Sequence, residues 1–239
     1  MRAYSSLSKA YNELMTDVDY DAWAAYINEL LDKVNARIYE TACGTGAISC
    51  RLFDFGHDIV ASDISADMLG EAIRTARETG REITFLQQDM RCFEAGKKAD
   101  AVLSACDGVN YIDEDGFLQF AQRAYSALKT GGVLLFDIST QAKLEKMDGQ
   151  IYFDDSDDVT CIWKNSYDKA RLTMEVTLFI REASLFERFS ETHIQYAHDI
   201  NSLSGILQKI GYSVINVFEF LTKEPCTSDT QRAQFVCRK

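Results

Sequence analysis

The chain has 239 residues, of which 46% are hydrophobic and 26% charged, and its formal net charge is −12. That length suits one large domain, or one domain with a sizeable insertion, which can bury a core without disulfides or structural metals. An acidic chain repels nucleic-acid phosphates and anionic lipid headgroups, so neither nucleic acid nor a membrane surface is an expected partner.

Cysteine usage and the N-terminal segment favour a cytosolic protein. The seven cysteines form neither a CxxC pair nor a Cys/His zinc pattern, which indicates reduced thiols and no metal site. Residues 1–17 lack the apolar core of a signal peptide, and no stretch approaches the ~18 apolar residues that a membrane span requires. We therefore expect a cytoplasmic protein that is a monomer or a homodimer.

The first half of the chain alternates amphipathic helices with short apolar runs. The first helix is expected to bury a stripe formed by Trp23, Ile27, Leu30, Leu31 and Val34. Strands are expected at 37–41, 58–62, 83–86, 101–104 and 133–138. Helices are expected between them at 47–55, from Ser65 to Gly80, and from about 115 to Gly131-Gly132. The second of these helices should carry Met68, Leu69, Ala72, Ile73 and Ala76 on one face. This alternation predicts βαβ crossovers and a parallel sheet covered on both faces.

The pattern changes to a period of two between about 150 and 196, which predicts an antiparallel meander with turns at 168–169 and 182–184. A helix ended by Gly211 and strands at 214–220 and 234–237 follow. We expect an α/β fold in which residues 1–145 and 197–239 form a doubly wound, seven-stranded, Rossmann-like sheet with an antiparallel hairpin at one edge. Residues 146–196 would be an antiparallel β insertion after the fifth strand.

A glycine turn follows the first strand, at the edge where an open parallel sheet binds ligands. Glu40 lies near the end of that strand, and Gly44-Thr45-Gly46 begins four residues later. Asp63 and Asp89 come at the ends of the second and third strands. A carboxylate at the position of Asp63 can accept both hydroxyl groups of a ribose, while Ile64 and Met68 offer apolar surface for an adenine ring.

Charge separates the candidate cofactors of such a site. Glu40 beside the turn would repel the pyrophosphate of a dinucleotide, and Ser49 stands where the NAD-type GxGxxG motif has its third glycine. Nearby carboxylates would instead stabilise the ammonium and sulfonium of S-adenosylmethionine. This pattern favours S-adenosylmethionine as the cofactor.

The segments 40–46, 88–90, 102–112 and 131–137, together with Asp63, resemble the successive motifs of class I S-adenosylmethionine-dependent methyltransferases. Residues 11–23, 106–111 and the β insertion resemble one group of small bacterial methyltransferases of that class. The resemblance implies methyl transfer to a small-molecule acceptor by in-line displacement, with the insertion as a lid or wall over the acceptor pocket. The alternatives are an aminopropyl transferase and a non-enzymatic protein that binds S-adenosylmethionine or S-adenosylhomocysteine.

The resemblance also implies which residues bind the cofactor. Glu40, Ala42 and Gly44 are expected around the methionine end, Asp63 at the ribose, and Cys106 near the sulfonium. The full set is Glu40, Ala42, Cys43, Gly44, Thr45, Gly46, Asp63, Ile64, Met68, Asp89, Met90 and Cys106. The chain departs from the family pattern at Ala42, which replaces a glycine and is tolerable if its φ is negative, and at Glu40, which replaces the more usual Asp.

The acceptor side has weaker candidates for catalysis: Tyr11, Tyr20, Asn110, Tyr111 and His193. Tyr11 and Tyr20 could close over the cofactor or the acceptor, or could simply begin a helix. Asn110 and Tyr111 follow the fourth strand, where a turn explains them equally well. His193, like His198, would be a general base only if the acceptor must lose a proton, and a lone histidine is more often structural.

Overall fold

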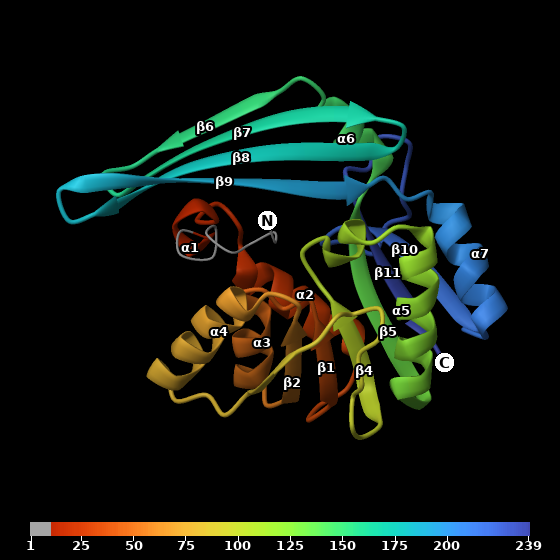
Figure 1. Ribbon diagram of the computed structural model, residues 1–239. Helices are drawn as coiled ribbons and strands as arrows, with labels where there is room; N and C mark the ends of the chain where they lie inside the picture. Colours follow the sequence, from red (N-terminus) through yellow and green to blue (C-terminus); the bar gives the residue numbers. More distant parts are fainter. Residues whose placement is uncertain (1–10) are drawn as a thin grey trace.

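The chain folds into a central sheet with helices on both faces and a second sheet above it (Figure 1). This computed structural model describes residues 11–239; residues 1–10, part of the segment analysed above for a signal peptide, lie outside the described residues. The strands of the central sheet are β1 (Arg37–Thr41), β2 (Asp58–Asp63), β3 (Thr84–Gln87), β4 (Ala99–Ser104), β5 (Leu128–Ser139), β10 (Val214–Glu219) and β11 (Arg232–Arg238).

Within the described residues this sheet has seven strands in the order β10-β11-β5-β4-β1-β2-β3. The strands β1 to β5 pair in parallel, whereas β11 is antiparallel to both β5 and β10. The predicted Rossmann-like sheet with an antiparallel hairpin at one edge is therefore confirmed. The parallel order places the carboxyl ends of β1, β2 and β4 side by side.

Two helical layers cover the sheet. One consists of α2 (Tyr20–Leu31), α3 (Ala47–Asp54) and α4 (Ala66–Glu78), and the other of α5 (Glu114–Ala127) and α7 (Ile200–Ile210). Successive strand residues enter opposite cores: Ile38 packs with the first layer and Tyr39 with the second. This alternation explains why the strands are apolar on both faces.

The second sheet consists of β6 (Ile151–Asp155), β7 (Val159–Asp168), β8 (Arg171–Glu182) and β9 (Leu185–Tyr196), paired antiparallel in chain order. Its two long hairpins turn at Lys169-Ala170 and at Ala183-Ser184, within the regions that were expected to be turns. Lys169, Ala170 and Ala183 have a positive φ. The sheet extends across the carboxyl ends of the central strands, with the short helix α1 (Tyr11–Leu14) beneath it (Figure 1).

The structure corrects several local predictions. The stripe on α2 ends at Leu31, because Asp32 is left-handed with a φ of 50°, and Val34 is 83% exposed. Gly131 and Gly132 do not end α5 but lie within β5, and a Cβ on Gly132 would come within 2.9 Å of the Lys129 carbonyl. Ile73, expected on the buried face of α4, is exposed. The short helix α6 (Gln141–Lys146) and the 3₁₀ helix η2 (Gly108–Tyr111) were not predicted.

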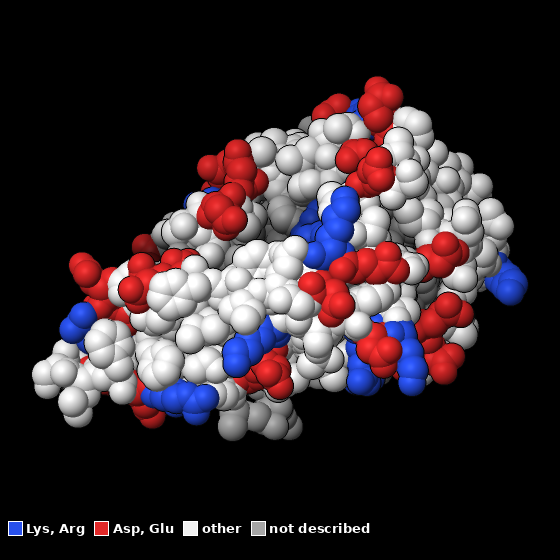
Figure 2. Space-filling model, turned by 90° about the horizontal axis from the view of Figure 1, so that it is seen from above, with Lys and Arg blue, Asp and Glu red and all other residues white. Residues whose placement is uncertain are grey.

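The distribution of charged side chains on the surface agrees with the acidic composition of the chain. Seen from above, basic side chains form small separate groups interrupted by acidic ones (Figure 2). None of the helices in the described part of the chain is long and apolar enough to cross a lipid bilayer.

Candidate functional site

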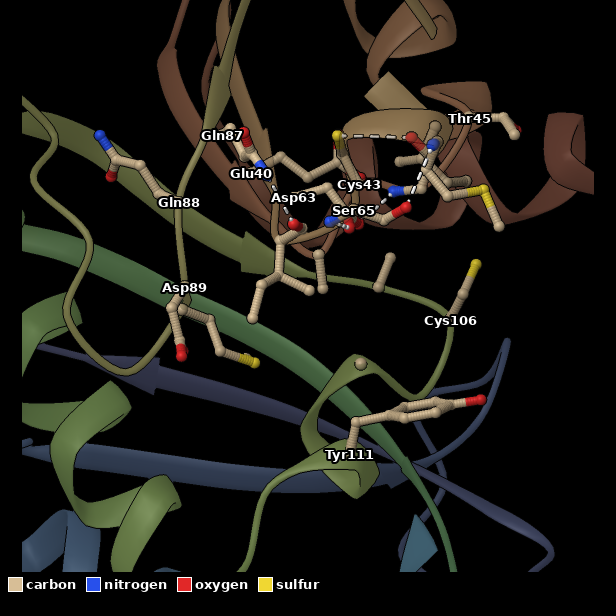
Figure 3. Close-up of a pocket in the computed structure, with 18 of the residues that line it drawn as sticks. Glu40, Cys43, Thr45, Asp63, Ser65, Gln87, Gln88, Asp89, Cys106 and Tyr111 are labelled. Atoms are coloured by element: carbon tan, nitrogen blue, oxygen red, sulfur yellow. Dashed lines mark hydrogen bonds between the residues drawn. The ribbon is translucent and has the colours of Figure 1, made fainter. Parts of the chain in front are cut away.

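A cavity of about 650 Å³ lies at the carboxyl ends of β1, β2 and β4 (Figure 3). Most of the residues predicted from the sequence line it: Tyr11, Tyr20, Glu40, Ala42, Cys43, Gly44, Thr45, Asp63, Ile64, Met68, Asp89, Met90, Cys106 and Tyr111. Three predicted residues, Gly46, Asn110 and His193, do not line this cavity. It is large enough for a nucleoside-sized ligand.

The turn between β1 and α3 has an unusual backbone. Ala42 has a φ of 52°, so the negative φ that would make an alanine tolerable at this position is not found. The backbone that follows Ala42 is fixed by two hydrogen bonds: the Cys43 amide donates to the Ser62 carbonyl at 3.0 Å, and the Gly46 amide donates to the Cys43 carbonyl at 2.9 Å. A left-handed alanine costs roughly 1–2 kcal/mol, so the surrounding hydrogen bonds must enforce this shape.

Gly46 supports the packing of the turn rather than the cavity wall. It is the N-terminal cap of α3 with a φ of 75°, and a Cβ there would lie 3.2 Å from the Cβ of Ala72 on α4. Glycine is required because the backbone is left-handed and α3 approaches α4 closely. Its contact with the cofactor stays a prediction.

The Asp63 carboxylate is oriented by the backbone around it. Oδ2 accepts the Gly44 amide at 2.9 Å, and Oδ1 accepts the Ser65 amide at 2.8 Å (Figure 3). Burial raises the pKa of Asp63, while the backbone hydrogen bonds from Ser65 and Gly44 oppose that rise. A carboxylate has about four lone-pair sites, so Asp63 keeps acceptor capacity on the cavity side.

Glu40 is the most deeply buried acid of the cavity, with 2% of its surface exposed. The Ser49 hydroxyl, in the first turns of α3, donates to Glu40 Oε2. Burial raises the pKa of Glu40 to about 8, more than the hydrogen bond from Ser49 lowers it. Glu40 therefore holds a proton at neutral pH until a cation is placed beside it. Sequence analysis missed Ser49, because no local pattern connects residues nine positions apart across a strand and a turn.

The far end of the cavity combines one ion pair with apolar side chains. Asp89 accepts hydrogen bonds from the amide of Arg91 at 2.9 Å and from its guanidinium, which lower the pKa of Asp89. Met68 and Met90 are buried in the cavity wall, whereas Ile64 is 59% exposed at its rim. Arg91 was also missed, although a basic residue two positions after Asp89 was visible in the sequence.

Three tyrosines and a cysteine close the side of the cavity below the second sheet. Burial raises the pKa of Tyr20 to about 12 and the pKa values of Tyr11 and Cys106 well above their usual ranges. Tyr111, from η2, and Cys106 both face the cavity (Figure 3). At neutral pH Tyr11, Tyr20 and Cys106 keep their protons, so Tyr11 and Tyr20 can donate hydrogen bonds but cannot serve as bases.

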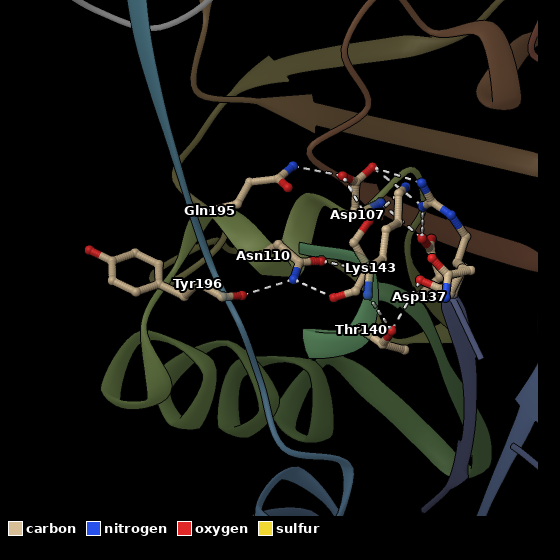
Figure 4. Close-up of polar contacts among 10 residues, drawn as sticks. Asp107, Asn110, Asp137, Thr140, Lys143, Gln195 and Tyr196 are labelled. Atoms are coloured by element: carbon tan, nitrogen blue, oxygen red, sulfur yellow. Dashed lines mark hydrogen bonds and ion pairs between the residues drawn. The ribbon is translucent and has the colours of Figure 1, made fainter. Parts of the chain in front are cut away.

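Two candidates lie outside this cavity. Asn110 is fully buried, and its side chain donates to the carbonyls of Ser139 and Tyr196 and accepts the Ser139 amide, so it is structural (Figure 4). His193 lines a separate, water-sized cavity beneath the second sheet. His198 is also structural, because its Nε2 lies 3.0 Å from the Ile112 carbonyl and 3.2 Å from the Val109 carbonyl.

Comparisons with known proteins agree with this geometry. Residues 38–132 match a methyltransferase domain family. The chain is 29% identical to YqeM of Bacillus subtilis (strain 168), provisionally named a methyltransferase, over 99% of this chain and 97% of that protein. It is 31% identical to the glycine/sarcosine N-methyltransferase of Halorhodospira halochloris, over 50% of this chain and 48% of that enzyme.

Among solved structures, the chain is similar to an S-adenosylmethionine-dependent methyltransferase from Clostridium acetobutylicum ATCC 824. The two are 25% identical, with a TM-score of 0.88 over 99% of each chain. This likeness includes the second sheet as well as the central one.

Proposed function

We propose that this chain, a class I S-adenosylmethionine-dependent methyltransferase, transfers the methyl group to a small-molecule acceptor by in-line displacement. The observation that supports the site assignment is the cavity at the strand ends, where Glu40 and Asp63 lie on either side of a turn with a left-handed backbone. Its cofactor is S-adenosylmethionine.

The residues of the cavity fit that cofactor. We assign the ribose hydroxyls to Asp63, because its carboxylate is fixed by two amides and retains lone pairs. We assign the ammonium to the neighbourhood of Glu40, where a cation would favour the ionised carboxylate. The adenine would lie against Ile64, Met68 and Met90, with Asp89 near its amino group, and Cys43, Thr45 and Cys106 would complete the wall.

Bound S-adenosylmethionine supplies a methyl carbon attached to a good leaving group. The chain's own contribution is then to align the acceptor with that carbon and to exclude water. Tyr11, Tyr20 and Tyr111 are placed to do both, since all three line the cavity on the side of the second sheet. We assign residues 146–196 as the lid over the acceptor pocket, and residues 1–145 and 197–239 as the cofactor-binding domain.

A small-molecule acceptor suits the molecule better than nucleic acid. The net charge is −12, and basic side chains on the face around the second sheet are interrupted by acidic ones (Figure 2). The Halorhodospira relative is named for glycine and sarcosine, both small amines, which supports an acceptor of similar size.

The ribose assignment is tested by replacing Asp63 with Ala. Calorimetric titration with S-adenosylhomocysteine should show affinity reduced about a hundredfold or more, because a charge-assisted pair of hydrogen bonds is lost. Asp58→Ala is the matched control, since Asp58 begins the same strand at its opposite end and pairs with Arg37 on the surface. Unchanged affinity in Asp63→Ala would remove the ribose assignment.

A further inference from the structure

The wall of the large cavity below the second sheet contains a strained turn. Cys106 and Asp107, between β4 and η2, have φ values of 58° and 51°. A left-handed conformation brings the Cβ of such residues close to the following carbonyl oxygen, so it persists only where neighbouring contacts enforce it. Residues held in this way are concentrated at functional sites, so the contacts that hold this turn are candidates for a functional role.

The turn determines where part of the cavity wall lies. Cys106, Gly108 and Tyr111 line the cavity. Asp107 lies between them in sequence but does not line it. Gly108 is tightly packed, because a Cβ on it would come within 2.9 Å of the Cβ of Ala42. A shift of the turn would therefore move this wall relative to Ala42 and the turn between β1 and α3.

Asp107 is held by residues from three strands (Figure 4). Its amide donates to Asp137 Oδ2 on β5 at 2.9 Å, and Arg232 on β11 lies 3.3 Å from its Oδ1. Gln195 on β9 donates from Nε2 to Asp107 Oδ2 at 2.7 Å. Among the described residues this is the shortest contact of the carboxylate, since Ser139 Oγ is 3.4 Å away and the Arg232 nitrogens are 3.3 and 3.4 Å away. The second sheet thus supplies the closest partner of the turn.

The second sheet has another connection next to this bond. Asn110 ties η2 to the end of β9 through the Tyr196 carbonyl at 2.9 Å. Gln195 precedes Tyr196, is 5% exposed and lies across from the apolar Leu172. An apolar side chain could fill this place without the cost of burying an amide. Loss of the Gln195 bond should therefore loosen the turn without detaching the sheet.

We propose that Gln195 is a positioning residue for methyl transfer, acting through the Asp107 carboxylate on the turn that places Cys106 and Tyr111 at the cavity. The inference rests on the function proposed above. The β insertion then does more than cover the cavity, because its last strand fixes the wall against which an acceptor aligns. A displacement of about 1 Å in such a position can slow a reaction about a hundredfold.

The position of the turn is tested through its own thiol. Gln195→Met keeps an unbranched side chain but has no N–H to donate. Alkylation by iodoacetamide, followed by peptide mass spectrometry, should modify Cys106 about tenfold faster than in the wild type, because local opening becomes easier. Cys43, which lines the same cavity, and Cys237, which is fully buried, should react at unchanged rates. An unchanged rate at Cys106 would overturn the proposal, and so would a similar increase at all three thiols, which would show general loosening.

The effect on catalysis is measured with radiolabelled S-adenosylmethionine and a bacterial small-molecule extract. At saturating cofactor, Gln195→Met should transfer label about tenfold more slowly than the wild type, because the acceptor is misaligned. Its calorimetric affinity for S-adenosylhomocysteine should not change. A wild-type rate in the variant would overturn this inference and leave the proposed function intact. Absence of transfer by the wild type would overturn the proposed function, and the inference with it.

The dependence on Asp107 is tested by a double-mutant cycle. Asp107→Gly removes the carboxylate, and glycine adopts a φ of 51° without strain. This variant alone should show the faster modification of Cys106 and the slower transfer, also where Gln195→Met does not fold. Adding Gln195→Met to it should change neither rate further, since the acceptor of the hydrogen bond is gone. A second, additive loss would show that Gln195 acts by another route and would overturn the proposal.

A matched variant controls for the substitution itself. Gln208→Met, on the exposed surface of α7, makes the same chemical change away from the cavity. It should keep the wild-type rates of thiol modification and of label transfer. If Gln208→Met slowed transfer as much as Gln195→Met, the effect would not come from the bond to Asp107 and the proposal would fail.

Discussion

At the scale of single residues, the acid at the end of β1 combines high burial with an unusual protonation state. Glu40 is enclosed by α3 and the glycine turn, and Ser49 is its hydrogen-bond donor. A carboxyl group held neutral in this way gains most from a cationic ligand, because the cation restores the charge that burial suppresses. The same residue must then destabilise the free protein at alkaline pH.

This argument predicts opposite effects of Glu40→Gln on stability and binding. Burial raises the pKa of Glu40 to about 8, against about 4.3 in an unfolded chain. Between these values the folded state holds a proton that the unfolded state has released, so the stabilising contribution is lost as pH rises through about 8. Thermal unfolding should therefore show that the variant gains Tm over the wild type as pH rises from 5 to 9, by the linkage argument.

The same substitution should weaken cofactor binding while it increases stability at alkaline pH. Glu40→Gln should bind S-adenosylmethionine about ten- to a hundredfold more weakly at alkaline pH, because a charge-assisted interaction is lost. Titration calorimetry in buffers of different ionisation enthalpy should detect proton release on wild-type binding and none in the variant. Glu78→Gln, on the exposed face of α4, is the control. Equal proton release in both proteins would contradict the role assigned to Glu40.

The outcome at single residues shows how far local reasoning extends. The place of Asp63 in the cavity wall was predictable, because the carboxyl ends of neighbouring parallel strands meet at one edge of the sheet. The backbone of Ala42 was not, because its left-handed φ is imposed by hydrogen bonds from Cys43 and Gly46 rather than by its own preference. The packing role of Gly46 could not be predicted for a similar reason: its contact with Ala72 depends on how α3 and α4 pack.

At the scale of secondary-structure elements, the side chain of one residue connects a 3₁₀ helix with two strands. Asn110 in η2 bonds the Ser139 amide and carbonyl at the end of β5 and the Tyr196 carbonyl at the end of β9 (Figure 4). The second sheet is thereby tied to the end of the central sheet next to the cavity. The sequence could not reveal this role, because the bonded backbone groups lie 29 and 86 residues away.

Asn110→Ala should therefore destabilise the protein by about 2–4 kcal/mol, since buried backbone groups of Ser139 and Tyr196 lose their partners. Urea denaturation measures this change, and hydrogen exchange should increase at the end of β9. Asn201→Ala, on the exposed surface of α7, is the control. A loss of under about 0.5 kcal/mol, the range of ordinary surface substitutions, would show that the clamp is not needed.

At the scale of the whole molecule, the alternation of strands and helices and the change to a period of two were enough to predict both sheets. What periodicity does not encode is how the sheets are joined. That joint is a buried polar network. Arg232 on β11 pairs with Asp137 on β5 and with Asp107, while Gln195 on β9 donates to Asp107 at 2.7 Å (Figure 4). Four segments that are distant in sequence meet at these charges.

From this network we can predict how the stability of the protein changes when the positive charge of Arg232 is removed. Arg232 is 16% exposed, lies 4.9 Å from the ring centre of Trp23, and opposes two carboxylates. Arg232→Met keeps the apolar contact with Trp23 but leaves both carboxylates without their partner. The variant should lose about 3–5 kcal/mol of stability at neutral pH, as expected when one member of a buried ion pair is removed.

The pH dependence separates this effect from a simple packing defect. Without the arginine, the pKa of Asp137, which burial already raises, should rise further, so the folded variant takes up protons as pH falls. Its deficit in urea denaturation should therefore shrink toward acidic pH, and Asp137→Asn in the Arg232→Met background should recover part of the loss at neutral pH. Arg238→Met, at the far end of β11, is the matched control. A deficit independent of pH would indicate that Arg232 acts through packing, and that the two sheets are joined by contacts other than this charge network.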